Sequence, residues 1–199
     1  MKRIVCFGDS NVYGYDPRSW LGDRYPADVR WTGLLETAGW QVRNEGFNGQ
    51  EIPTSRWEQD HWCDRLRQAD SPDWALVMLG GNDLLCHPGF TAENVANRME
   101  TMLTRFLAVS DRDRTRFLLI SPPPMVPGTW ITDARLLRES ARFAGCYQNV
   151  AEKLGVIFAD AGQWGIDLAF DGVHFLPDGH RSFARRLLTV LDEQQTIRA

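Results

Sequence analysis

The sequence has no excess of positive charge and no long hydrophobic run. Its 199 residues include 22 Lys and Arg against 26 Asp and Glu, which gives a formal net charge of -4. A chain without a basic footprint is not expected to bind nucleic acid. No apolar run approaches the roughly 20 residues of a membrane span, and no signal-peptide cleavage pattern follows Met1. We therefore expect no membrane span and a cytoplasmic location.

Cysteine is sparse, and its spacing is not that of a ligand set. The four cysteines are scattered and form no Cys-x-x-Cys pair, which favours reduced, mostly buried thiols over a disulfide framework or a zinc site. The sequence also lacks a phosphate loop, a dinucleotide-binding glycine fingerprint and a His-Glu-x-x-His motif. Nothing in it points to metal or nucleotide chemistry.

Length and composition indicate one globular domain spanning residues 1–199. Hydrophobic residues make up 43% of the chain and charged residues 24%. A chain of this size can bury roughly 70% of its unfolded surface, which is enough for a full core. The sequence contains no internal repeat, linker or low-complexity segment that would divide it.

Hydrophobic runs typical of buried strands alternate with helical patterns. The expected strands are 4–7, 41–44, 73–79, 117–120 and 155–160, and the expected helices are 29–38, 55–69, 91–107, 133–154 and 177–191. This alternation requires crossover connections and therefore a parallel sheet. The fold class is α/β, a three-layer α/β/α sandwich with a five-stranded parallel sheet. We take the strand order 2-1-3-4-5 by analogy with flavodoxin-like folds.

The first expected strand ends at the step Gly8-Asp9-Ser10. This step puts Ser10 at the carboxyl edge of the sheet, where open α/β sheets bind their ligands. The simpler alternative is a strand-to-helix turn in which Ser10 or Asp9 caps the helix. We interpret Asp9 as structural, bracing the turn.

A nucleophilic serine needs an imidazole base and usually a carboxylate that orients the imidazole. His174, with Asp171 three residues before it, offers both after the last expected strand, at the same edge as Ser10. The alternative for an isolated Asp-x-x-His is a satisfied surface turn. The remaining histidines fall inside a polar helix, beside Pro88 after the third strand, and on the closing helix, where packing or capping is expected: His61, His87 and His180.

An ester carbonyl under attack develops an oxyanion, which needs hydrogen-bond donors. The candidates at three strand ends are the Ser10 N–H, the Gly49 N–H and the Asn82 side-chain amide. Gly49 is equally typical of a left-handed turn, and Asn82 of a side chain that braces its own loop.

Aromatic residues are concentrated in loops that we expect over the site. The turn-rich segment 12–27 contains Tyr13 and Trp20, and the loop after the fourth strand contains Trp130. Loops of this length are uncommon unless they have a function, so we expect these residues in a substrate wall. The alternative is a surface loop with its own aromatic cluster.

Four stretches resemble, in order, the four blocks of the SGNH (GDSL-type) hydrolases: Gly8-Asp9-Ser10, Gly49, Gly80-Gly81-Asn82-Asp83 and Asp171-Gly172-Val173-His174. The resemblance implies that Ser10 is the nucleophile, His174 the base, Asp171 its orienting partner, and Ser10, Gly49 and Asn82 the oxyanion donors. It also implies esterase chemistry on small acyl esters without a cofactor. Segments 7–17 and 30–33 look most like the arylesterase and acyltransferase branch.

One residue departs from the pattern of this family. Asn11 stands where many members have leucine, a change that alters the shape and polarity of the acyl pocket. We therefore add Asn11 to Tyr13, Trp20 and Trp130 as candidate substrate-binding residues.

The sequence thus predicts a serine esterase that acts on a small-molecule acyl ester through an acyl-Ser10 intermediate. Three alternatives stay open: an acyltransferase to alcohol or sugar acceptors, a carbohydrate deacetylase, and a non-catalytic module that binds an acylated ligand. The physiological ester and the oligomeric state are not readable from the residues, and a homo-oligomer is left open.

Overall fold

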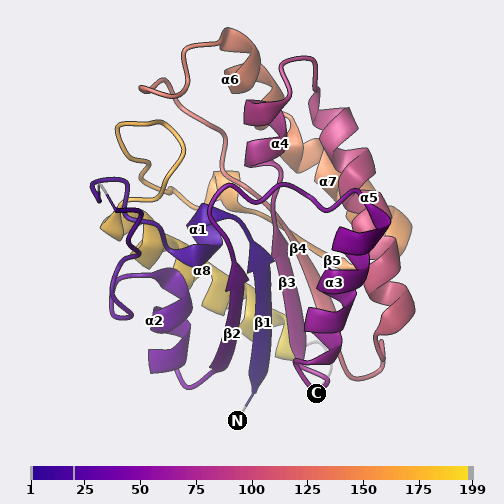
Figure 1. Cartoon of the computed structure of the whole chain (residues 1–199). Helices are drawn as coiled ribbons and strands as arrows, with labels where there is room; N and C mark the ends of the chain where they lie inside the picture. Colours follow the sequence, from indigo (N-terminus) through magenta and orange to yellow (C-terminus); the bar gives the residue numbers. More distant parts are fainter. Residues whose placement is uncertain (1, 20, 197–199) are drawn as a thin grey trace.

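The computed structural model describes residues 2–19 and 21–196. Its centre is a sheet of parallel strands in the order β2-β1-β3-β4-β5, as predicted. The strands are β1 (Arg3–Gly8), β2 (Gln41–Gly46), β3 (Trp74–Met78), β4 (Arg116–Ser121) and β5 (Ile157–Asp160). All of them end at the same edge, which is the upper edge in Figure 1.

Helices cover both faces of the sheet (Figure 1). They are α1 (Ser10–Tyr13), α2 (Trp31–Thr37), α3 (Arg56–Arg67), α4 (Gly81–Cys86), α5 (Ala92–Val109), α6 (Ala134–Ala141), α7 (Phe143–Leu154) and α8 (Pro177–Thr196), with a 3₁₀ turn at Ala161–Gln163. Helices α3, α5 and α7 pack on one face, and α2 and α8 pack on the other. The predicted three-layer sandwich is confirmed.

The side chains of β1 show how one strand serves two cores. Val5 and Phe7 join the core under α3, α5 and α7, whereas Ile4 and Cys6 join the core under α2 and α8. Successive side chains of a strand point to opposite faces, so a strand between two helical layers must be apolar throughout. This requirement explains the continuous hydrophobic run.

The long helix expected over 133–154 is in fact two helices, α6 and α7, with a break at Arg142. Near the break, the Ser140 hydroxyl accepts a hydrogen bond from the Met125 N–H (3.0 Å) and donates to the Leu137 carbonyl (3.3 Å). A serine that bonds back to its own helix competes with the backbone ladder and bends the helix. The turn at Arg142 anchors the loop after β4 to α6.

The described residues contain no helix that combines the length and the apolarity needed to cross a membrane. All four cysteines are free thiols, as the sequence analysis expected. Cys6 and Cys63 are buried, whereas Cys86 is exposed.

Candidate active site

Ser10 is the first residue of α1, directly after β1. Asp9 caps this helix, since its Oδ1 accepts the Asn11 N–H at 2.9 Å, so the expected bracing role of Asp9 is confirmed. The turn is tight because residue 8 is glycine: a Cβ there would lie 2.0 Å from Val12 Cγ2. The result is a serine that stands at the carboxyl edge of the sheet with only 6% of its surface exposed.

The structure brings Asp171, His174 and Ser10 together in a chain of hydrogen bonds. His174 Nε2 lies 2.9 Å from Ser10 Oγ, and His174 Nδ1 lies 2.7 Å from Asp171 Oδ2. The other oxygen of Asp171 accepts the N–H groups of Val173 (2.9 Å) and His174 (3.0 Å). A carboxylate at Nδ1 keeps the proton there, so the lone pair of Nε2 faces the serine hydroxyl.

The two carboxyl groups nearest to the imidazole differ in their electrostatics. Burial would raise the pKa of Asp171, but hydrogen bonds from the His174 ring and from the His174 and Val173 N–H groups outweigh it and lower that pKa. At Asp9 burial dominates over the Asn11 N–H and the nearby His174, and it raises the pKa to about 6. Asp171 is therefore the carboxylate whose ionised form the site favours, whereas burial disfavours the ionised form of Asp9.

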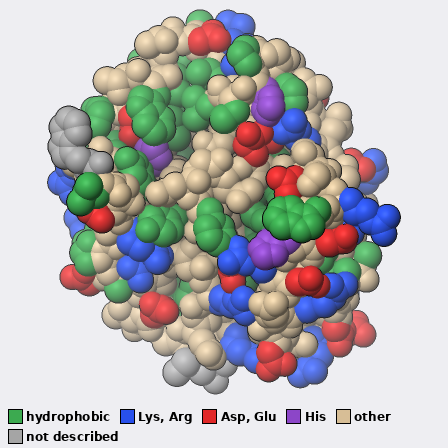
Figure 2. Space-filling model, in the orientation of Figure 1, with side chains coloured by type: hydrophobic (Ala, Val, Ile, Leu, Met, Phe, Trp, Pro, Cys, Tyr) green, Lys and Arg blue, Asp and Glu red, His purple; other side chains and the backbone are tan. Residues whose placement is uncertain are grey.

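Two aromatic rings lie against the imidazole. The ring centroids of Tyr15 and Trp130 are 4.6 Å and 5.0 Å from that of His174. Trp130 is held there because its N–H donates to the Asp171 carbonyl (3.3 Å). In Figure 2, hydrophobic side chains gather around a histidine on the upper left of the molecule. The imidazole thus has apolar neighbours as well as Ser10 and Asp171.

Two further aromatic residues were selected from the sequence, and the structure describes one of them. The ring of Tyr13 lies under the Arg24 guanidinium, 4.5 Å from it, and Trp20 falls outside the described residues. Tyr15 belongs to the segment 12–27 that is expected over the site, although it is not among the individual candidate residues. Its position depends on Gly14, which ends α1 with a φ of +92° and turns the chain back. A glycine four residues after the serine was the available signal.

Gly49 and Asn82 follow β2 and β3, on either side of the β1 end. Gly49 has a φ of +72°, so it is a left-handed turn residue, and Asn82 Nδ2 donates to the Gln50 carbonyl at 3.0 Å. The structural alternative for Gly49 is therefore realised, whereas Asn82 braces the loop after β2 and not its own loop. These arrangements do not exclude an oxyanion role, because an amide NH₂ has two hydrogens and this bond uses one.

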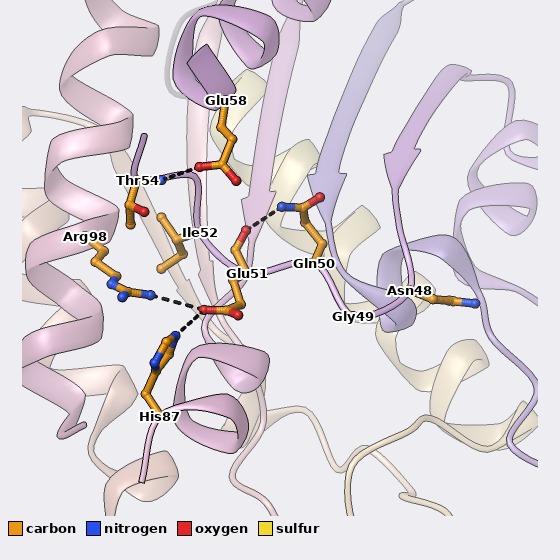
Figure 3. A pocket seen from close by; sticks show the side chains of 9 residues that line it. All are labelled: Asn48, Gly49, Gln50, Glu51, Ile52, Thr54, Glu58, His87 and Arg98. Carbon is orange, nitrogen blue, oxygen red and sulfur yellow. Dashed lines mark hydrogen bonds and ion pairs between the residues drawn. The ribbon is translucent and has the colours of Figure 1, made fainter. Parts of the chain in front are cut away.

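A charged network ties the loop after Gly49 to α4 and α5 (Figure 3). Asp83 accepts the Ile52 N–H (3.1 Å) and is paired with Arg98 (2.8 Å). Arg98 also reaches Glu51 (3.2 Å), and His87 Nε2 lies 2.7 Å from the same carboxylate. Sequence reasoning missed this network, because its members are far apart in the chain and carry no motif spacing.

The network borders a cavity of about 410 Å³. Its lining is mostly polar and includes Asn48, Gly49, Glu51, Glu58, His87 and Arg98 (Figure 3). Carboxylates, a guanidinium and amides give it both donors and acceptors, which suits an uncharged ligand with several hydroxyl groups. The cavity is the second feature of this edge that the sequence did not reveal.

Asn11 is buried, and its side chain faces the backbone beside His174. It lines a small cavity of about 20 Å³ together with Asp9 and Met125, and both polar atoms of its side chain are bonded to the backbone. The cradle around Ser10 and His174 is thus formed by α1, by the turn 171–174 and by the loops after β2 and β3.

Comparison with known proteins identifies the family of the chain. Residues 6–182 match the model of the GDSL-like Lipase/Acylhydrolase family. A search of curated proteins finds no match.

Solved structures resemble the chain over nearly its whole length. The aryl esterase of M. smegmatis is 25% identical, with a TM-score of 0.86 over 97% of this chain and 99% of that one. A carbohydrate acetylesterase family member from Sinorhizobium meliloti is 26% identical, with a TM-score of 0.83 over 96% and 97%. Est24, a carbohydrate acetylesterase from the same organism, is 21% identical with a TM-score of 0.85 over 98% and 100%, and supports the fold alone.

Proposed function

The chain belongs to the GDSL-like lipase/acylhydrolase family and is a carboxylic ester hydrolase; from this premise we propose that it cleaves short acyl esters through an acyl-Ser10 intermediate. The observation that carries the proposal is the hydrogen-bonded chain from Asp171 through His174 to Ser10, with distances of 2.7 Å and 2.9 Å. Nucleophile, base and orienting carboxylate then have the geometry that acyl transfer needs.

In the first half of the reaction, Ser10 Oγ attacks the ester carbonyl and His174 Nε2 takes the hydroxyl proton. Asp171 stabilises the imidazolium that results and keeps its ring oriented. The imidazolium then gives the proton to the leaving alcohol, and the acyl group stays on Ser10. In the second half, His174 removes a proton from a water molecule that attacks the acyl carbonyl. The bond between the acyl carbon and Ser10 Oγ then breaks, the imidazolium returns its proton to Oγ, and the acid leaves.

The oxyanion of each tetrahedral intermediate needs donors that are already in place. We assign this role to the N–H groups of Ser10 and Gly49 and to the amide of Asn82. In known enzymes such a donor contributes about 2.7 to 4 kcal/mol to the lowering of the barrier. The bond from Asn82 to the Gln50 carbonyl supports the assignment, because it fixes the amide before substrate arrives.

Replacement of Ser10 by alanine tests the proposal. Hydrolysis of p-nitrophenyl acetate should fall by about 10³-fold or more, as in triad knockouts of other serine hydrolases. A fluorophosphonate probe should label the wild-type chain at Ser10 and leave Ser10→Ala unlabelled. Unlabelled wild-type protein without turnover would instead support a module that only binds acylated ligands.

The polar cavity beside Gly49 favours a second candidate, the deacetylation of carbohydrates. Its lining of Glu51, Arg98 and His87 can bond the hydroxyl groups of a sugar, whereas an aryl group gains little there. The test is kcat/KM for an acetylated xylo-oligosaccharide and for p-nitrophenyl acetate, in wild type and in Thr54→Val. A fall in kcat/KM for the sugar ester alone supports carbohydrate deacetylation. An equal fall for both substrates rejects it.

The rings of Tyr15 and Trp130 at the imidazole favour an acyl-transfer branch of the same chemistry. Apolar walls beside the base disfavour water relative to an organic alcohol as the second nucleophile. Product partitioning between acetate and benzyl acetate, measured with benzyl alcohol present, decides between the two. Transfer should decrease in Trp130→Ala, and pure hydrolysis by the wild type rejects this branch.

A further inference from the structure

The side chain of Asn11 joins the segment that carries Ser10 to the segment that carries His174. Its Nδ2 donates to the Val173 carbonyl at 3.1 Å, and its Oδ1 accepts the Phe175 N–H at 2.9 Å. These two residues flank His174, so one amide holds the backbone on both sides of the imidazole. The amide orientation follows from its partners, because a carbonyl can only accept and an N–H can only donate.

Asn11 is itself held firmly. Its N–H donates to Asp9 Oδ1 (2.9 Å), and its carbonyl accepts the indole N–H of Trp31 (2.9 Å). The residue is buried, with 8% of its surface exposed. Both backbone groups and both polar side-chain atoms of Asn11 therefore have partners, and the amide behaves as a rigid spacer directly after Ser10.

Few other polar contacts control the distance between the two segments. Among the described residues, the hydrogen bonds that join 9–13 to 168–176 are the two from the Asn11 amide and the one between Ser10 and His174. Asp171 cannot replace Asn11 in this respect, because it lies in the same turn as the imidazole and moves with it.

In this chain the partners of the Asn11 side chain require one donor and one acceptor. Leucine would leave the Val173 carbonyl and the Phe175 N–H without these partners. Aspartate would accept from Phe175, but its second oxygen would face the Val173 carbonyl. Asparagine supplies one donor and one acceptor at the required reach.

We propose that Asn11 is a positioning residue that sets the distance between His174 Nε2 and Ser10 Oγ, an inference that rests on the proposed function of these two groups. Misplacement of a catalytic group by about 1 Å costs about 100-fold in rate. Asn11→Leu should therefore lower kcat for p-nitrophenyl acetate by about 10- to 100-fold. KM should stay within about three-fold, because Asn11 binds the protein backbone and not the ester.

Asn44 offers a matched control on the opposite side of α1. Its amide donates to the Val12 carbonyl (2.7 Å) and to Thr32 Oγ1 (3.1 Å), and its Oδ1 accepts the Gly46 N–H (2.9 Å). Asn44→Leu therefore loses a comparable set of bonds without touching the His174 segment. It should lower Tm as Asn11→Leu does while changing kcat less than about three-fold. Equal losses of kcat in the two variants, or an unchanged kcat in Asn11→Leu, would overturn the proposal.

Asn11→Asp keeps the shape of the residue and decides the matter if Asn11→Leu does not fold. It keeps the acceptor for Phe175 and loses the donor to Val173, so kcat should lie between wild type and the loss expected for leucine. A wild-type kcat in Asn11→Asp rejects the positioning role. Ser10→Ala in the same assay separates the two levels of inference: hydrolysis that does not depend on Ser10 defeats the proposed function, whereas Ser10-dependent hydrolysis with normal Asn11 variants defeats only this inference.

Discussion

The two sides of the candidate site are held in place by different forces. On the base side, Asp171 and His174 are buried and fixed by short hydrogen bonds, by the Asn11 amide and by aromatic rings. On the donor side, the loop after Gly49 is fixed through Arg98, which is 22% exposed and pairs with Glu51, 33% exposed, and with the buried Asp83. Salt and water screen the second set far more than the first. The base side is therefore preorganised by burial, and the donor side depends on solvent conditions.

The largest expected effect lies on the base side. Asp171→Asn should lower kcat by about 10³- to 10⁴-fold, because the amide can offer an N–H to His174 Nδ1 and favour the wrong tautomer. The turn should survive, since the Asn oxygen can still accept the N–H groups of Val173 and His174. Stopped-flow or steady-state assays with p-nitrophenyl acetate measure kcat. A decrease in kcat of less than ten-fold would remove Asp171 from the mechanism.

On the donor side, Asn82→Ala should lower kcat by about 10²- to 10³-fold with a smaller change in KM. The substitution removes a proposed oxyanion donor and also the bond to the Gln50 carbonyl. Asn82→Asp keeps the size of the side chain but can donate neither to the oxyanion nor to the Gln50 carbonyl, so it tests whether donation rather than bulk is needed. If Asn82→Asp retains wild-type kcat, Asn82 does not stabilise the oxyanion. The proposed division of the site into a base side and a donor side then fails.

Arg98 tests whether charge holds the donor loop. Asp83 is fully buried. Arg98→Met would leave the Asp83 carboxylate with the Ile52 N–H but without its ion pair. The loss should lower the unfolding free energy by about 3 kcal/mol. Arg105→Met is the matched control on the same helix, since Arg105 pairs with the exposed Asp60 and should cost less than about 1 kcal/mol. Urea unfolding compares the two, and equal costs would show that the buried pair is not special.

The fold and the proposed reacting groups were accessible from the sequence for a physical reason. Strands buried on both faces must be apolar throughout, and each ends where glycine and a polar side chain begin, as after Phe7 and Leu79. Parallel strands then bring distant turns to one edge, which is why the sequence alone pairs Ser10 with His174.

The supporting residues could not be found in this way. Glu51, His87 and Arg98 are ordinary surface types, and their meeting depends on the rotation of α5 against the loop after Gly49. Tyr15 reaches the imidazole only because Gly14 turns the chain, a conformation that the aromatic pattern does not encode. The sequence thus indicated the groups that we propose to react, and packing determines what holds them.

The smallest expected effect concerns pH and lies behind the base side. His180 is fully buried against Phe175, and burial, with Arg30 nearby, lowers its pKa to about 3. Below pH 6.5 the His180 imidazole is protonated in the unfolded chain but not in the folded chain. The unfolding free energy therefore falls with pH, by up to about 1.4 kcal/mol per pH unit.

Asp9 has the opposite effect on the pH dependence of stability, and its contribution must be subtracted. Its pKa of about 6 exceeds the ordinary 3.8, so the folded state binds its proton more readily, and acidification from pH 6 towards 4 stabilises the protein through this group. We therefore compare the unfolding free energies of wild type and His180→Phe, because Asp9 contributes equally to both. Between pH 7.5 and 5.5 the difference between the two should shift by about 1.4 kcal/mol in favour of the variant. A constant difference would mean that His180 is protonated in the folded protein and that the base side is open to water.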